Sequence, residues 1–218
     1  VISSQKANFM NPQYPPTILG GAAFSKYVDE IRLETNKNKE GLLILDGGNF
    51  FQGSSIGMAD DGKTIVEWMN RIGYDALVPG SYDFISGANN LNNLADIANF
   101  PFLSSNIICN NCPLISSNFT PYVIKNIVGV QVGIIGIVNS NLSELVLAEN
   151  LSDVVTNKEV PSIKNWIPKM KSEGAEVIII LTSSGVPWNR EKEYKQFMRQ
   201  VHSKTIDENS SLNALEMA

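Results

Sequence analysis

Short apolar runs alternate along most of this chain with segments of helical periodicity. The apolar runs end in turn residues, as strands do, and lie at residues 42–46, 74–79, 102–107 and 176–181. Apolar residues at helical spacing predict helices at residues 20–36, 65–72, 91–98, 163–170 and 189–203. Pro168 is expected to kink its helix or to start a new turn. This alternation predicts a layered α/β fold.

Two stretches rich in β-branched residues interrupt the alternation. Residues 122–125 and 130–138 are separated by residues 126–129, which predicts an antiparallel hairpin and therefore a mixed sheet or two sheets. Residues 20–218 are expected to form one domain behind an irregular lead-in at residues 1–19, which several prolines interrupt. The chain begins at Val1 and ends in a helical pattern without a stop signal, so we expect a fragment of a longer protein.

The first helix is expected to bury one loosely periodic apolar face. That face consists of Ala23, Tyr27, Ile31 and Leu33. The helix at residues 65–72 is followed by Gly73, a residue that suits the left-handed conformation in which many helices end. We therefore expect that helix to be core-facing and to end at this glycine.

Composition excludes several classes of partner. The 218 residues carry a net charge of −5 without a basic cluster, which argues against binding to nucleic acid or to an anionic membrane surface. An apolar content of 43% with a mean hydropathy of −0.05 is that of an ordinary globular protein. Because no apolar run approaches about 20 residues, no membrane-spanning helix is expected.

The cysteines form a single Cys-x-x-Cys pair, Cys109 and Cys112. A structural zinc site would need two further soft ligands, but the sequence has no other cysteine and its one histidine is His202. A redox-active pair normally opens a helix after a strand, whereas Pro113 and a polar loop follow here. Two interpretations stay open, a local loop disulfide and a pair of free thiols.

Five segments, in this order, resemble the metallophosphoesterase domain of the 5′-nucleotidase family. They are LDGGNFFQG at residues 45–53, MNRIGYDA with GSYDF at 69–76 and 80–84, FPFLSSNI at 100–107, the hairpin at 121–138, and LTSSGV at 181–186. The resemblance spans roughly residues 20–190. It implies an α/β/β/α sandwich with two packed mixed sheets. It also implies a pair of divalent metals, such as zinc or manganese, that hydrolyses nucleotide phosphomonoesters through an activated water.

The family's metal-binding and catalytic positions carry other residues in this chain. The bridging aspartate falls on Asn49, the asparagine–histidine pair on Ser81 and Tyr82, and the downstream histidine on Ser183. These neutral groups cannot compensate the charge of two dications as carboxylates and imidazoles do. Asp83 matches a position that orients the missing histidine, and its other interpretation is a turn cap.

The remaining charged candidates give little support for a metal site. Asp46 is expected to bond loop amides, His202 to face solvent, and Asp60 with Asp61 to form a solvated turn. The family's Asp-x-His block is not visible in residues 1–19, and its Gly-His-x-His block would lie beyond Ala218.

Three hypotheses follow. The first is a degenerate domain without metal chemistry, in which loop amides around Gly47, Gly48 and Gly80 bind a nucleotide or another small phosphorylated ligand. The second is a working phosphohydrolase with an altered ligand set, and the third is a non-catalytic scaffold or interaction domain. The resemblance also implies a missing C-terminal domain that holds the nucleotide base, and a periplasmic or extracellular location.

Overall fold

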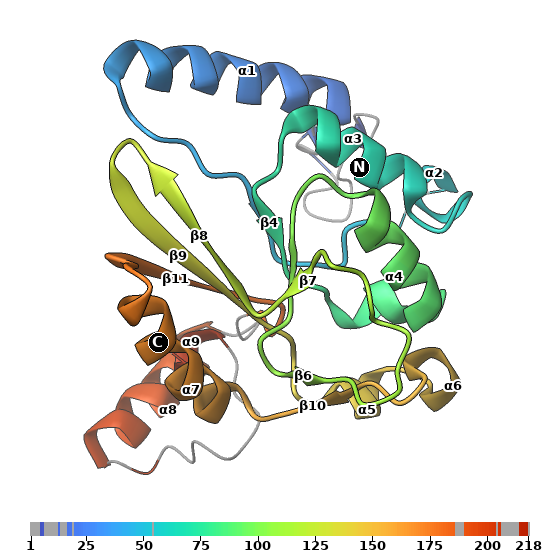
Figure 1. Cartoon of the computed structure of the whole chain (residues 1–218), viewed down its shortest axis with the longest axis vertical. Helices are drawn as coiled ribbons and strands as arrows, with labels where there is room; N and C mark the ends of the chain where they lie inside the picture. Colours follow the sequence, from blue (N-terminus) through green and yellow to red (C-terminus); the bar gives the residue numbers. More distant parts are fainter. Residues whose placement is uncertain are drawn as a thin grey trace.

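A parallel four-stranded sheet forms the larger β-layer of the computed structural model (Figure 1). The structure describes residues 5–6, 13, 17–18, 20–53, 55–185, 190–203, 205 and 214–217. The strand order is β3 (Leu45–Asp46), β4 (Ala76–Leu77), β5 (Phe102–Leu103) and β7 (Phe119–Thr120). Parallel neighbours require crossover connections, and helices supply the first two of these. The connecting helices are α2 (Ser55–Met58), α3 (Lys63–Ile72), the 3-10 turn η1 (Ser81–Phe84) and α4 (Ala88–Ile97).

A mixed three-stranded sheet forms the second β-layer. Its order is β11 (Val177–Thr182), β9 (Val130–Ile137) and β8 (Tyr122–Ile127). β8 and β9 pair antiparallel, which confirms the predicted hairpin, and β11 runs parallel to β9. The turn needs only Val128 and Gly129, both with positive φ, as tight hairpins require.

Helices cover the outer faces of both sheets (Figure 1). α1 (Gly21–Asn38), α3 and α4 lie on the side of the four-stranded sheet. α7 (Glu159–Ser172), which contains Pro168, lies on the three-stranded sheet, with α8 (Arg190–Ser203) and α9 (Ala214–Met217) nearby. The predicted α/β/β/α sandwich is therefore confirmed, with mixed pairing confined to the smaller sheet.

Strand β9 shows how the layers are held together, because both of its faces are buried. Val132 and Ile134 point into the core between the two sheets, where they join Ala76 and Leu103. Ile135 and Ile137, on the opposite face, pack against α7. A third and larger core fills the space between α3, α4 and the four-stranded sheet; it includes Phe51, Val66, Met69, Leu77, Leu91 and Phe102.

Two local predictions need correction. The expected apolar face of α1 is wrong at Tyr27 and Leu33, which are 55% and 73% exposed. The helix instead buries Val28 and packs Phe24 against the core, because these residues and not the other two lie on the side that faces Ile44. Other sequence signals hold, since α3 ends at Gly73 with φ 76°.

The predicted strand at residues 102–107 is two strands. β5 ends at Leu103, and the backbone N–H of Ser105 donates to the carbonyl of Gly136 in the other sheet (2.9 Å). The chain then forms β6 (Ile107–Ile108), which pairs antiparallel with β10 (Val155–Thr156). The break follows from this bond across the layers, which diverts the chain from the larger sheet.

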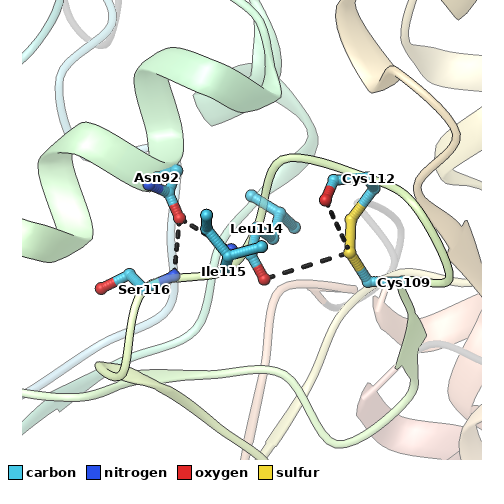
Figure 2. Close-up of a disulfide and its surroundings, with 6 residues drawn as sticks. All are labelled: Asn92, Cys109, Cys112, Leu114, Ile115 and Ser116. Atoms are coloured by element: carbon cyan, nitrogen blue, oxygen red, sulfur yellow. Dashed lines mark hydrogen bonds between the residues drawn. A yellow bond between two sulfur atoms is a disulfide. The ribbon is translucent and has the colours of Figure 1, made fainter.

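The remaining segments are short. α5 (Leu142–Leu145) and α6 (Ala148–Leu151) connect β9 to β10. Within the predicted irregular lead-in, β1 (Gln5–Lys6) and β2 (Thr17–Ile18) form an antiparallel pair. Cys109 and Cys112 form a disulfide in the loop after β6, which decides between the two interpretations of this pair (Figure 2). Across the described residues, no helix is both long enough and apolar enough to cross a membrane.

Candidate functional site

The loops that follow β3 and β4 touch each other at the carboxyl end of the larger sheet, where α/β proteins commonly bind ligands. Asp46 ends β3, and its Oδ1 accepts the N–H of Gly48 at 2.8 Å. Gly48 has φ 88°, and a Cβ at this position would collide with the backbone of Val78 and Gly80. The contact between the loops therefore requires glycine at position 48.

Asp83 connects the two loops through backbone hydrogen bonds. Its side chain is fully buried, and its carboxylate accepts three backbone N–H groups. Oδ2 accepts from Asn49 (2.7 Å) and Gly80 (2.8 Å), and Oδ1 accepts from Phe50 (3.0 Å). Of its two predicted roles, the structure places Asp83 in that of a cap.

Asn49 and Gln52 add side-chain hydrogen bonds between the same two loops. Asn49, with φ 60°, turns its Oδ1 to accept the N–H of Tyr82 at 2.9 Å. Gln52 donates from Nε2 to the carbonyl of Tyr82 at 2.6 Å. We call Asn49, Gln52, Tyr82 and Asp83, with the hydrogen bonds they make between the loops, the cross-loop latch. Gln52 was missed as a site residue, although it lies in the quoted LDGGNFFQG segment.

Both carboxylates of the junction are perturbed by burial. Burial raises the pKa of Asp83 to about 7, although the three N–H donors oppose the shift, and the charge of Asp46 adds to it. Burial also raises the pKa of Asp46, and the N–H of Gly48 opposes this change. The same Asp46 charge contributes, after burial, to raising the pKa of Tyr74 to about 12. The junction is therefore a region where negative charge is costly.

The other predicted positions lie around this junction. The end of β11 lies beside the end of β3, because a Cβ on Gly47 would lie only 3.6 Å from the carbonyl oxygen of Thr182. The next residue, Ser183, accepts the N–H of Asn139 through its Oγ at 3.1 Å. Ser81 and the 60%-exposed Tyr82 line a hollow of about 220 Å³. The structure thus gathers the predicted positions at one end of the sheets.

His202 lies apart from this group, on α8. It is exposed, as expected, and its Nδ1 lies 2.6 Å from the carbonyl of Met198. Asp60 and Asp61 form a turn, as expected: Asp60 accepts the N–H and hydroxyl of Thr64, and Asp61 accepts the hydroxyl of Ser86. None of these side chains adds a ligand at the strand ends.

The residues present do not fit the pair of metals that the resemblance implies. Dications of this kind need several anionic or imidazole ligands around one cavity. At the matched positions the structure has an amide and a hydroxyl, Asn49 and Ser183, and both accept backbone N–H groups. The described part of the chain contains no group of three or more histidine, cysteine, aspartate or glutamate side chains placed to hold a metal.

The loop amides proposed for an anionic ligand are partly engaged. The N–H of Gly48 donates to Asp46, and the N–H of Gly80 donates to Asp83. An anion bound there would have to displace a carboxylate from each. Ligand binding by Gly47, Gly48 and Gly80 stays a prediction.

The sequence of this chain is similar to those of known 5′-nucleotidases. The chain is 31% identical to rat 5′-nucleotidase over 172 residues, which is 77% of this chain and 29% of the relative. It is 34% identical over 158 residues to the snake venom 5′-nucleotidase of Gloydius brevicauda, covering 70% of this chain and 26% of the relative. No family model matches the chain.

Solved structures agree with these sequence relatives. The calcineurin-like phosphoesterase YfkN of Bacillus subtilis superposes with a TM-score of 0.60 at 27% identity, over 75% of this chain and 54% of that one. The chain spans less than a third of the length of the curated relatives above. It belongs to the 5′-nucleotidase family, as an N-terminal domain of the metallophosphoesterase type.

Proposed function

We propose that this chain is a degenerate metallophosphoesterase domain that binds no metal pair and does not hydrolyse phosphomonoesters. One observation carries the proposal: the residue at the family's bridging-aspartate position, Asn49, uses its side-chain oxygen to accept the N–H of Tyr82. A neutral amide brings no charge to compensate two dications, and an oxygen already engaged in a hydrogen bond is a weaker ligand still. The hydrogen bond to Tyr82 thus ties the side chain at this matched position to the neighbouring loop.

A second candidate is a phosphohydrolase with an altered site. It is favoured by two carboxylates, the half-buried Asp46 and the fully buried Asp83, whose raised pKa values are of a kind often found at functional sites. Against it, both carboxylates already accept N–H groups of their own loops. In a degenerate domain the same carboxylates serve only to hold the backbone.

The partners follow from the family. A nucleotide or similar phosphorylated ligand is proposed because the relatives are named nucleotidases, and a further C-terminal domain because they are more than three times longer than the matched region. A location outside the cytoplasm is proposed because one relative is a venom protein and because disulfides persist in oxidising compartments.

Metal content and hydrolysis measured on the same sample test the proposal. The full-length protein is purified in zinc or manganese, dialysed, and analysed by mass spectrometry for bound ions, with rat 5′-nucleotidase as the positive control. We expect no stoichiometric metal and no hydrolysis of adenosine monophosphate above buffer. A pair of ions per chain together with chelator-sensitive hydrolysis would refute the proposal.

A matched pair of variants then separates the two candidates. If an altered site hydrolyses phosphate, Asp46→Asn should abolish the activity, whereas Asp153→Asn, at an exposed position on the connection between α6 and β10, should not. Thermal shifts with nucleotides and inorganic phosphate report ligand binding independently of hydrolysis. A shift without hydrolysis supports a ligand-binding domain, and its absence supports a scaffold.

A further inference from the structure

The disulfide after β6 joins sulfurs in different surroundings (Figure 2). Cys109 is exposed, whereas Cys112 is only 4% exposed and belongs, with Leu114, to the core beneath α4. Solvent reagents therefore reach one end of this bond and not the other. Asn110 and Asn111, between the two cysteines, are also exposed, so the approach to Cys109 is polar and open.

The far end of the loop is anchored independently of the disulfide. Asn92, on α4, accepts with its Oδ1 the backbone N–H groups of Ile115 (2.9 Å) and Ser116 (2.7 Å) (Figure 2). Leu114 lies next to this anchor and is buried. Opening the disulfide would therefore leave the chain docked from Cys112 onward and would release the part around Cys109.

We propose that Cys109 is a site of thiol–disulfide exchange, attacked by low-molecular-weight thiols. A thiolate attacks Sγ of Cys109, the S–S bond breaks, and its electron pair leaves on Sγ of Cys112, which then takes a proton from water. A second thiolate attacks the external sulfur of this mixed disulfide, which gives an external disulfide and releases Cys109 as a thiolate that takes a proton from water. Two thiols are oxidised and one protein disulfide is reduced.

The surroundings of Cys109 make it a recipient of exchange and not an oxidoreductase centre. Its Sγ lies 3.2 Å from the carbonyl oxygen of Cys112 and 4.0 Å from that of Leu114. Carbonyl oxygens repel a thiolate and accept from a thiol, whereas catalytic cysteines are activated by positive charge or a helix N-terminus. The pair also lies in a loop between β6 and β7, with no helix opening at either cysteine.

Single-cysteine variants test which sulfur reacts. Cys112→Ser leaves Cys109 free, and Cys109→Ser leaves Cys112 free. Adduct formation with glutathione disulfide measures how accessible each sulfur is. In native buffer we expect it to be at least about tenfold faster for Cys112→Ser than for Cys109→Ser, because the buried sulfur reacts only after local opening. In guanidinium the two rates should become equal. Equal rates in native buffer, or faster reaction at Cys112, would overturn the assignment.

The wild-type protein supplies the second measurement. It is incubated with excess reduced glutathione, quenched with N-ethylmaleimide and digested for mass spectrometry. We expect the disulfide to open while the circular dichroism stays native, with maleimide or glutathione on Cys109 before Cys112 is labelled. A disulfide that survives this treatment until the protein unfolds is purely structural, and that result would refute the proposal.

Discussion

Replacing Asp83 by asparagine should remove a large part of the pH dependence of folding. The carboxyl is fully buried, and its pKa in the folded protein is about 7, against an ordinary value of 3.8. A group that holds its proton more tightly when folded stabilises the protein most below the ordinary pKa, and this contribution is lost as pH rises towards the folded pKa. A rise of about three pH units at 1.36 kcal/mol each gives a loss of about 4 kcal/mol between pH ~4 and pH ~7.

The asparagine variant also carries a cost that does not depend on pH. Its single side-chain oxygen can keep the two N–H groups that Oδ2 accepts, from Asn49 and Gly80, while its NH2 group faces the N–H of Phe50. One buried donor is then left without an acceptor, which costs about 1–3 kcal/mol. The variant should therefore be the less stable protein near pH 4, and its disadvantage should shrink or reverse by pH ~8.

Urea unfolding followed by circular dichroism across this pH range measures the difference. Asp153→Asn, at an exposed position, is the matched control and should run parallel to the wild type. A stability difference between wild type and Asp83→Asn that is constant with pH would refute the reasoning. A difference that grows with pH would show that the three N–H donors outweigh burial and lower the pKa of Asp83 instead.

Two further predictions concern the backbone at the junction and the disulfide. Gly48→Ala should destabilise the protein by more than about 3 kcal/mol, because the added Cβ would collide with the backbone of the neighbouring loop. Gly53→Ala, at a position with φ 81° and open space around it, should cost only about 1–2 kcal/mol. Equal unfolding midpoints of the two variants in denaturant would contradict this expectation. Replacing both Cys109 and Cys112 by serine should lower the free energy of unfolding by about 2 kcal/mol, the value expected for a disulfide that closes a four-residue loop. If calorimetry shows a much larger loss of stability, Cys112 matters chiefly for packing.

The sequence predicted best those features that depend on local patterning. The hairpin of β8 and β9 and the end of α3 at Gly73 follow from periodicity and turn residues, and both are confirmed. The single strand at residues 102–107 failed because Ser105 bonds to Gly136 in the other sheet. No local pattern encodes a bond between residues that are 31 positions apart.

The sequence predicted that the candidate residues lie together, but it predicted only some of the contacts between them. Motif order placed Asn49, Tyr82 and Asp83 at the ends of two strands, and the structure brings them together. The expectation that Asp46 bonds loop amides is confirmed at Gly48, whereas the N–H groups that Asp83 accepts depend on how its side chain is oriented after folding. Residue identity alone does not fix that orientation, so the latch could not be predicted.

The place where the two sheets meet has an evolutionary consequence. Gly136 faces Leu103 so closely that any Cβ at position 136 would collide with the leucine and its backbone. A larger residue can enter β9 there only if position 103 becomes smaller and its strand moves away. Because this constraint concerns the spacing of the layers and not the strand-end loops, the two positions should covary in active and inactive relatives alike.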